Sequence, residues 1–311
     1  MNVVFMGTPD FSVGALEAII KAGHHVTCVV TQPDKRKGRG KEMQYTPVKE
    51  CALQHNIPVF QPVKIKTPEA IEELRQYEAD IFVVAAFGQI LSQEILDMPQ
   101  YGCVNIHASL LPKYRGAAPI QWAILDGEET TGVTIMQMNA GLDTGDMLLK
   151  REVEITSVET GESLHDKLAM VGADLIVEAL VEIEAGNITP EKQDDTHTCY
   201  AKMLTKSLGE IDWSVEGDAI ERKIRGLNSW PSAYTYYKGK TFKIWESTLL
   251  EEQSDTPGVI VRVEKDGIFV ASGKGTLKIT QLQLEGKKRM QVKDFLLGYK
   301  IQTGEILGKN A

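Results

Sequence analysis

The sequence has few cysteines, and their placement suits neither a metal site nor a disulfide framework. Four cysteines are spread over 311 residues, and no two of them form a C-x-x-C pair. Such spacing argues against zinc knuckles and disulfide-stapled secreted domains, and it is compatible with a reducing compartment. We therefore expect a cytoplasmic protein that binds no metal. The cysteines are Cys28, Cys51, Cys103 and Cys199.

Long hydrophobic runs are also missing. No apolar stretch approaches the roughly 20 residues that a transmembrane helix needs. The first residues, Asn2 to Met6, have the pattern of a strand and lack the basic and apolar regions of a signal peptide. We expect no association with a membrane.

The dinucleotide-binding fingerprint is absent as well. A nicotinamide enzyme would carry G-x-G-x-x-G after its first strand and an acidic residue at the end of its second. Here Gly7 stands alone until Gly14, and the second predicted strand, Val26 to Val30, runs into Thr31-Gln-Pro. The sequence therefore disfavours a nicotinamide-dependent dehydrogenase.

Strand and helix patterns alternate through the first part of the chain, whose length favours two domains. Ile81 to Ala85 is a continuous apolar run of the kind found in parallel sheets, and Ser163 to Ala185 has apolar residues at helical spacing. The pattern predicts an α/β chain with a Rossmann-like parallel-sheet domain over 1–188 and a linker over 189–207.

The remainder, 208–311, is predicted to form a small, OB-like β-barrel. One helical segment, Val215 to Leu227, precedes several short β-type runs that are separated by glycine-containing turns. These runs are Ala233–Tyr237, Thr241–Ser247, Gly258–Glu264, Gly267–Ala271 and Thr276–Leu284.

The net charge of −9 speaks against a nucleic-acid partner, but the charge is unevenly distributed. Residues 1–206 hold 18 Lys and Arg against 29 Asp and Glu, whereas residues 207–311 hold 16 against 14. A polyanion should therefore meet the second segment and selected loops. Two cation clusters suit phosphates, although a run such as the first is also typical of a solvated loop. They are Lys35, Arg36, Lys37, Arg39 and Lys41, and Lys287, Lys288 and Arg289.

The most informative stretch runs from Tyr101 to Pro119. Asn105 and His107 alternate with apolar residues in a short strand-like run, so their side chains should project from one face. We expect them at the C-terminal end of the strand, where open α/β sheets bind ligands. Taken singly, such residues are more often a turn asparagine and a packed histidine. Together they offer an amide donor beside an imidazole, which suits a tetrahedral oxyanion.

A carboxylate further along the chain could complete this pair. Asp143 lies in the glycine-flanked loop Asn139 to Gly145, after a strand pattern at Thr131 to Met138. An aspartate in such a turn is usually a turn former. If it reached His107, it would hold the imidazole cationic and fix its orientation. We predict this contact, with Asp143 again at the C-terminal edge of a strand.

These residues resemble a known signature. Asn105, His107 and Asp143, with Ser-Leu-Leu-Pro-Lys-Tyr-Arg-Gly between them, resemble the active site of the 10-formyltetrahydrofolate-dependent formyltransferases. Other segments resemble the branch of that family that acts on initiator tRNA, so that the likeness spans nearly the whole chain. They are Val-Phe-Met-Gly-Thr-Pro-Asp-Phe near the start, Gln-Pro-Asp at 32–34, Ile-Arg-Gly-Leu-Asn-Ser-Trp-Pro at 224–231 and Glu-Gly-Lys-Lys-Arg-Met-Gln at 285–291.

The resemblance implies transfer of a formyl group from 10-formyltetrahydrofolate to the α-amino group of methionyl-initiator tRNA, giving N-formylmethionyl-tRNA for translation initiation. It implies a monomer in which the first cation cluster enters the acceptor end of the tRNA, with Arg39 at the most important position. In relatives the bond corresponding to Leu111–Pro112 can be cis, a point that the sequence leaves open. Catalysis is assigned to Asn105, His107 and Asp143. Folate binding is assigned to Phe87, Gly88, Ile90, Leu91, Ser109, Leu110, Leu111, Pro112 and Asn139.

Other interpretations remain open at this point. Ile90 and Leu91 individually fit a core-facing loop nearly as well as a folate pocket. The same core could formylate glycinamide ribonucleotide or a nucleotide sugar amine, or hydrolyse 10-formyltetrahydrofolate. The first cation cluster and the predicted barrel argue against these, because a small-molecule enzyme does not need them. A non-catalytic tRNA-binding protein would leave Asn105, His107 and Asp143 without a purpose.

Overall fold

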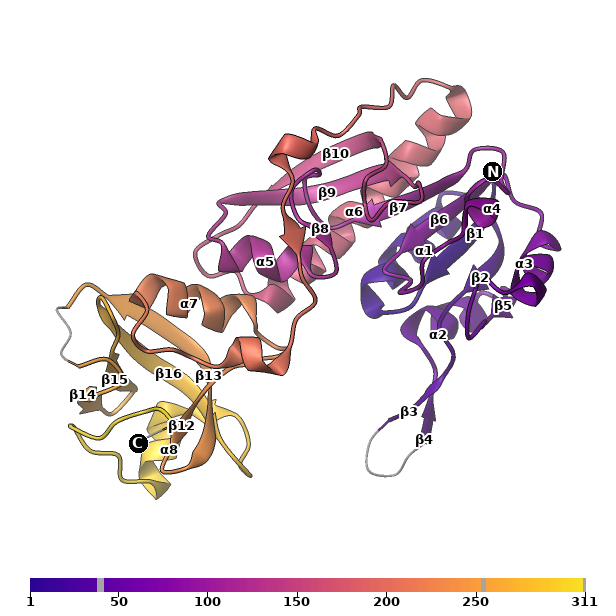
Figure 1. Cartoon of the computed structure of the whole chain (residues 1–311). Coiled ribbons are helices and arrows are strands. Elements are labelled where there is room, and N and C mark those ends of the chain that lie inside the picture. Colours follow the sequence, from indigo (N-terminus) through magenta and orange to yellow (C-terminus); the bar gives the residue numbers. More distant parts are fainter. Residues whose placement is uncertain (38–41, 253–255, 310–311) are drawn as a thin grey trace. The chain divides into compact units, whose positions relative to one another are not determined.

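The computed structural model describes residues 1–37, 42–252 and 256–309 (Figure 1). Contacts between residues divide the chain into two units, and the chain passes from one to the other several times. The first unit comprises Met1–Pro119, Thr130–Glu154 and His165–Ala201, and the second comprises Ile120–Glu129, Ile155–Leu164 and Lys202–Ala311.

The first unit is built on a seven-stranded sheet. Its strands are β1 (Asn2–Gly7), β2 (His25–Val30), β5 (Val59–Phe60), β6 (Ile81–Ala85), β7 (Cys103–His107), β9 (Thr130–Gln137) and β10 (Met147–Glu154), in the order β10-β9-β7-β6-β1-β2-β5. The predicted parallel sheet is confirmed from β5 to β7. At the other edge β9 pairs antiparallel with both β7 and β10, which the sequence did not predict.

The centre of this sheet is apolar on both faces. Every residue of β6 is buried, and Val3 to Met6 of β1 are fully inaccessible. Continuous burial of this kind is expected where both faces of a sheet are covered.

In the part of the chain that the structure describes, no helix has both the length and the apolar character required to cross a membrane. In chain order up to residue 201, the α-helices are α1 (Val13–Lys21), α2 (Pro47–Gln54), α3 (Pro68–Arg75), α4 (Gln93–Leu96), α5 (Pro119–Leu125) and α6 (Gly161–Ala185). A 3-10 turn, η1 (Asp10–Ser12), precedes α1.

Two of these helices begin at a threonine cap followed by proline. Thr46 precedes α2 and accepts a hydrogen bond from the backbone N–H of Lys49, and Thr67 does the same for Ala70 in α3. In both helices proline occupies the first position, where its missing N–H has no intrahelical partner to lose.

The second unit contains an antiparallel sheet packed with two helices. Alternate residues of its strands, such as Phe242 and Ile244, face an apolar core that also contains Ile220 and Phe295 from the helices. The predicted β-rich domain is confirmed, while its closure into an OB-like barrel stays a prediction. The strands are β12 (Ala233–Tyr237), β13 (Lys240–Leu250), β14 (Ile260–Glu264), β15 (Gly267–Ala271), β16 (Thr276–Leu284) and β17 (Met290–Gln291), and the helices are α7 (Gly217–Gly226) and α8 (Val292–Gly298). The order is β12-β13-β16-β15-β14, with β17 paired to β16.

Much of the expected linker is paired with the first unit. Glu191 bridges Met147, and β11 (Tyr200–Ala201) pairs in parallel with β8 (Arg115–Gly116). Two 3-10 turns, η2 (Asp195–His197) and η3 (Lys206–Gly209), lie in the same stretch. The boundaries at 188 and 208 stay predictions.

The first cation cluster is framed by a short hairpin. Strands β3 (Lys35–Lys37) and β4 (Glu42–Gln44) pair antiparallel, where the sequence predicted only a loop. The Asp34 carboxylate beside this hairpin accepts hydrogen bonds from Lys49 Nζ at 2.5 Å and Gln61 Nε2 at 2.8 Å. Arg39 and Lys41 lie outside the residues that the structure describes.

Candidate active site

Strand β7 ends in the two polar residues that the sequence singled out. Asn105 pairs in register with Val84 of β6 and Met136 of β9, and His107 closes the strand. Since they are two positions apart, both side chains project from the same face of the sheet. His107 is buried, with 5% of its surface exposed, and Asn105 is half-buried.

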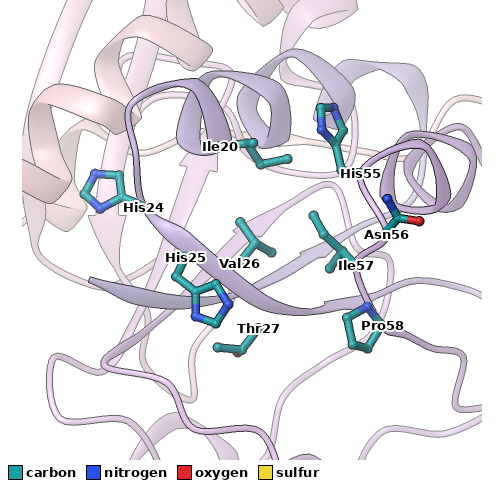
Figure 2. A pocket seen from close by; sticks show the side chains of 9 residues that line it. All are labelled: Ile20, His24, His25, Val26, Thr27, His55, Asn56, Ile57 and Pro58. Carbon is teal, nitrogen blue, oxygen red and sulfur yellow. The ribbon is translucent and has the colours of Figure 1, made fainter.

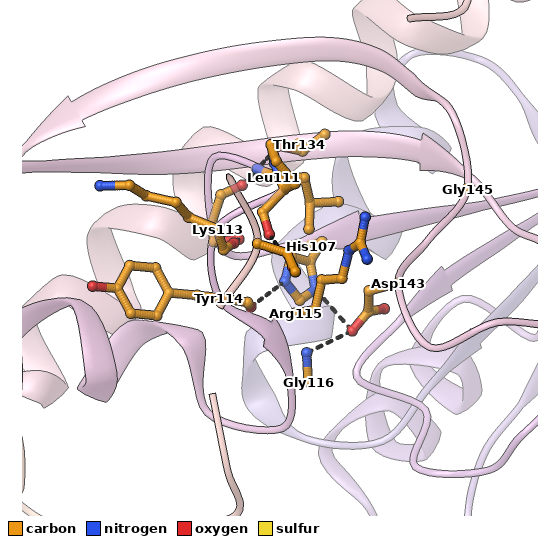
Figure 3. Close-up of polar contacts among 12 residues, drawn as sticks. His107, Leu111, Lys113, Tyr114, Arg115, Gly116, Thr134, Asp143 and Gly145 are labelled. Carbon is orange, nitrogen blue, oxygen red and sulfur yellow. Dashed lines mark hydrogen bonds and ion pairs between the residues drawn. The ribbon is translucent and has the colours of Figure 1, made fainter. Parts of the chain in front are cut away.

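The imidazole of His107 has a different neighbour at each nitrogen (Figure 3). Nε2 lies 2.9 Å from the backbone oxygen of Tyr114, and Nδ1 lies 3.8 Å from Oδ2 of Asp143. A carbonyl oxygen can only accept, so Nε2 must carry a proton. Tyr114 has φ = 59°, a backbone conformation that non-glycine residues rarely adopt. Because Nε2 is engaged by Tyr114, Nδ1 is the ring nitrogen that remains available to a ligand, beside the Asp143 carboxylate.

Asp143 is held in the loop 138–146 between β9 and β10. Its Oδ2 accepts a hydrogen bond from the backbone N–H of Gly116 at 2.8 Å, so the carboxylate contacts both His107 and the loop after it. The side chain of Asn139 shapes the same loop, since its Oδ1 accepts from Gly141 N at 3.0 Å and Thr144 Oγ1 at 2.8 Å.

The route by which Asp143 reaches His107 corrects the prediction from the sequence. Strand β9 runs antiparallel to β7, so that Gln137 is level with Val104 and Thr134 is level with His107. The C-terminal end of β9 therefore lies at the edge where β7 begins. Asp143 approaches His107 because its loop turns back, and the two residues do not follow strand ends at one edge.

Asn105 has a free amide next to this pair. Within the described ranges, its side chain forms no hydrogen bond to another residue. An amide N–H that has no partner in the protein can donate to a ligand without first breaking an internal bond. The structure thus places an available donor on the same strand face as His107, whose Nδ1 lies beside the Asp143 carboxylate.

The loop after His107 is braced by Thr134 of β9, a residue that the sequence pattern did not single out. Thr134 of β9 donates from Oγ1 to the carbonyl oxygen of Ser109 at 2.7 Å and accepts from Leu111 N at 3.1 Å. Ser109 Oγ donates to the carbonyl oxygen of Lys113 at 2.6 Å. The Leu111–Pro112 peptide is cis, which the sequence had left open. A polar residue between Val133 and Ile135 was the available signal for Thr134 in the sequence.

Comparison with known proteins gives the family. The family model for formyl transferase matches residues 1–180, and the model for its C-terminal domain matches residues 203–300. The chain is 57% identical over 307 residues to the methionyl-tRNA formyltransferase of Agathobacter rectalis, covering 98% of this chain and 99% of that protein. It is 52% identical over 315 residues to the protein of the same name from Lachnospira eligens, with 99% and 100% covered. The chain belongs to the methionyl-tRNA formyltransferase family.

Solved structures that resemble this family member share its fold. The N-formyltransferase from Helicobacter canadensis, in complex with folinic acid and dTDP-3-aminofucose, has a TM-score of 0.67 at 20% identity and covers 89% of this chain and 98% of its own. HypX from Aquifex aeolicus, in complex with tetrahydrofolic acid, has a TM-score of 0.63 at 16% identity, with 97% of this chain and 50% of its own covered. At these identities the likeness shows the fold alone.

The residues expected to bind folate in this formyltransferase are exposed to different degrees. Phe87 and Leu91 belong to the core of the first unit, so their side chains pack inward. Ile90 is 72% exposed, and Gly88 is exposed with φ = 81°. Of these four residues, Ile90 presents the only apolar side chain that a ligand could cover.

The folate residues after His107 are more deeply placed. Leu111 is buried against Met136 and Met147, whereas Leu110 and Pro112 are half-buried. Ser109 is fully buried and its hydroxyl is engaged within the loop. Ser109 and Leu111 therefore expose almost no surface that a ligand could cover.

The second cation cluster lies on an exposed turn between β16 and β17. Lys287, Lys288 and Arg289 are all exposed. The guanidinium of Arg289 lies 4.6 Å from the ring centre of Trp245, and Lys243 Nζ lies 5.5 Å from the same ring. This grouping of cations around an indole was not predicted. In the first cluster Lys35 is exposed.

Two cavities of the first unit are lined by residues other than Asn105, His107 and Asp143. A hollow of about 450 Å³ is bordered by His24, His25 and His55 near the start of β2 (Figure 2). A second, of about 540 Å³, is bordered by Pro62, Val63 and other residues before and within α3. In the described part of the chain, no three or more His, Cys, Asp or Glu side chains gather as a metal site.

Proposed function

We propose that this protein transfers the formyl group of 10-formyltetrahydrofolate to the α-amino group of methionyl-initiator tRNA in the cytoplasm. The observation that carries the proposal is 57% identity to a methionyl-tRNA formyltransferase along 98% of the chain, which includes both units. Such identity across the second unit favours tRNA over a small-molecule acceptor. The folates bound to two structures of the same fold support a folate as the formyl donor.

In the proposed reaction the substrate supplies its own nucleophile. The neutral amine of the methionyl group attacks the formyl carbon, and a C–N bond forms. The carbonyl oxygen of the formyl group gains negative charge in a tetrahedral intermediate. The bond from carbon to N10 of the folate then breaks, while the proton lost by the amine is balanced by one gained at N10. No nucleophilic side chain is required, and the Ser109 hydroxyl is already engaged with Lys113.

Asn105 and His107 stabilise the intermediate in this scheme. The free amide of Asn105 donates to the developing oxyanion, and Nδ1 of His107 donates beside it. The hydrogen bond from Nε2 to Tyr114 supports this assignment, because it fixes the ring and leaves Nδ1 on the side of the carboxylate. After the intermediate forms, His107 delivers the proton that N10 needs to leave.

Asp143 has two roles in this scheme. Its carboxylate stabilises the cationic form of His107, and it accepts the proton of the attacking amine through a water molecule. The 3.8 Å separation between Oδ2 and Nδ1 is longer than a direct hydrogen bond but within the range of an ion pair, which supports an electrostatic role for the carboxylate beside His107.

The test is a direct assay. The protein is incubated with methionyl-initiator tRNA and 10-formyltetrahydrofolate, and formylmethionine is detected after the ester is hydrolysed. Parallel reactions contain a nucleotide sugar amine, or no acceptor. Formylation of the sugar amine in preference to the tRNA, or rapid formate release without any acceptor, would replace the proposal with one of the alternatives.

The first cation cluster yields a prediction about tRNA. The double substitution Arg39→Ala with Lys41→Ala should weaken tRNA binding and lower the slope of log K against log salt by about 1–2, because each phosphate contact contributes roughly 0.7–0.9 to that slope. Binding of the folate should not change. Tritiated or fluorescent tRNA binding at several salt concentrations measures the effect. The control is Lys64→Ala with Lys66→Ala, which removes two exposed lysines from the same unit; an equal salt slope in both double variants would contradict the prediction.

The loop of Asp143 yields another prediction. In Gly145→Ala the added Cβ would lie 1.7 Å from the carbonyl oxygen of Gln137, so the loop must move. A displacement of about 1 Å at a reacting group can cost roughly 10²-fold in rate, and we expect a loss of that order in kcat. Steady-state kinetics and thermal melting measure it. Gly14→Ala is the control, because its Cβ would meet nothing closer than 3.8 Å; the prediction fails if both variants keep the wild-type kcat.

A further inference from the structure

The side chain of Gln193 binds the backbone of the loop that carries Asp143. Its side-chain Nε2 donates to the carbonyl oxygen of Asp143 at 2.8 Å and to that of Gly145 at 2.7 Å. Two hydrogen bonds from one amide to carbonyls two residues apart restrain the peptide units between them. Gln193 is half-buried, whereas its neighbours along the chain, Lys192 and Asp194, are exposed.

The other end of the same amide is bound to Arg115. Gln193 Oε1 accepts from Arg115 Nε at 2.9 Å and Nη2 at 2.8 Å. The guanidinium can only donate, so the oxygen must face it and the NH2 group must face the two carbonyls. Arg115 has 2% of its surface exposed and directly follows Tyr114, whose carbonyl oxygen accepts from His107. One side chain thereby joins the segment that holds His107 to the loop that carries Asp143.

The backbone of Asp143 needs such support. Asp143 has φ = 51°, in the left-handed region that L-residues seldom adopt. A strained conformation persists where the surrounding structure imposes it. The direction of the carboxylate follows from the backbone that carries it, so a relaxed loop would turn Oδ2 away from His107.

We propose that Gln193 is a positioning residue for the reaction, holding the Asp143 carboxylate toward His107 through hydrogen bonds to the loop backbone. The inference rests on the proposed function, since it assumes that Asp143 and His107 act in formyl transfer. Gln193 acts through Asp143 and needs no contact with the folate or the tRNA. Only an amide fits this position, because it must accept from the guanidinium at one end and donate to two carbonyls at the other.

Two substitutions separate these contacts. Gln193→Ala removes all of them. Gln193→Glu keeps an acceptor for Arg115 but places a carboxylate oxygen against the two carbonyls, which it cannot donate to. In both variants we expect kcat to fall by about 10-fold or more, with little change in KM for either substrate and with an altered pH profile of kcat. The matched control is Gln54→Glu, the same chemical change at an exposed glutamine of α2.

The outcomes are distinguishable. A wild-type protein that does not formylate methionyl-tRNA would overturn the proposed function and this inference with it. An active wild type with Gln193 variants of equal kcat would overturn the inference alone. A fall in kcat that matches the fraction of unfolded protein in thermal melts, with an unchanged pH profile, would also overturn it, since Gln193 would then serve only the fold. If Gln193→Ala does not fold, the kcat and pH profile of Gln193→Glu decide.

Discussion

Asn105→Ala should lower kcat for formyl transfer by about 10²–10³-fold, the loss seen when one oxyanion donor is removed from other enzymes. The amide is half-buried and has no partner among the described residues, so its removal breaks no internal hydrogen bond. Folding stability and KM for the folate should therefore change little. Steady-state kinetics with methionyl-tRNA, together with thermal melting, measures both effects.

Two further variants test whether the effect belongs to the N–H donor. Asn105→Asp has nearly the same shape but offers an oxygen in place of the NH2 group, and it should be at least as inactive as Asn105→Ala. Asn187→Ala, at an exposed asparagine after α6, should keep wild-type activity. Near-normal turnover in Asn105→Ala would remove this residue from the mechanism.

Asp143→Asn should lower kcat by about 10²–10⁴-fold, the usual contribution of a positioned acid or base. Asparagine can still accept the hydrogen bond from Gly116 N, so the loop should keep its conformation. It can neither take a proton from the amine nor stabilise a cationic His107. Steady-state kcat of the variant and the wild type, measured under the same conditions, tests this.

Asp174→Asn is the control for the loss of one carboxylate. Asp174 is exposed on α6, and its substitution should leave kcat unchanged. An Asp143→Asn variant with the kcat of this control would exclude Asp143 as the proton acceptor. The amine would then be deprotonated by solvent before it binds.

The elements that the sequence predicted well are those in which local pattern decides the structure. The alternation that placed Asn105 and His107 on one face of a strand is a property of any extended chain, and β7 has it. The bounds of β12, β15 and β16 agree with the predicted runs, because each run ends at a turn containing glycine or lysine. The family signature then gave the chemistry that the pattern alone could not assign.

What the sequence did not predict depends on partners far along the chain. The alternation of β9 contains no information on whether it pairs parallel or antiparallel with β7. The position of Asp143 depends on Gly116 and Gln193, which lie 27 and 50 residues away in sequence. The hairpin β3–β4 was missed because its strands consist mostly of charged and polar residues, whose local pattern resembles that of a loop.

The interleaving of the two units has a practical consequence for dissecting the protein. Two internal segments, 120–129 and 155–164, belong to the second unit although they precede its main part by many residues. Within the second unit Arg225 donates to the carbonyl oxygen of Glu159, and Arg222 donates to that of Leu125. A C-terminal fragment starting at 208 would lose both acceptors. Expression of the second unit on its own therefore requires grafting these two segments, and a single cut in the chain cannot separate the two units cleanly.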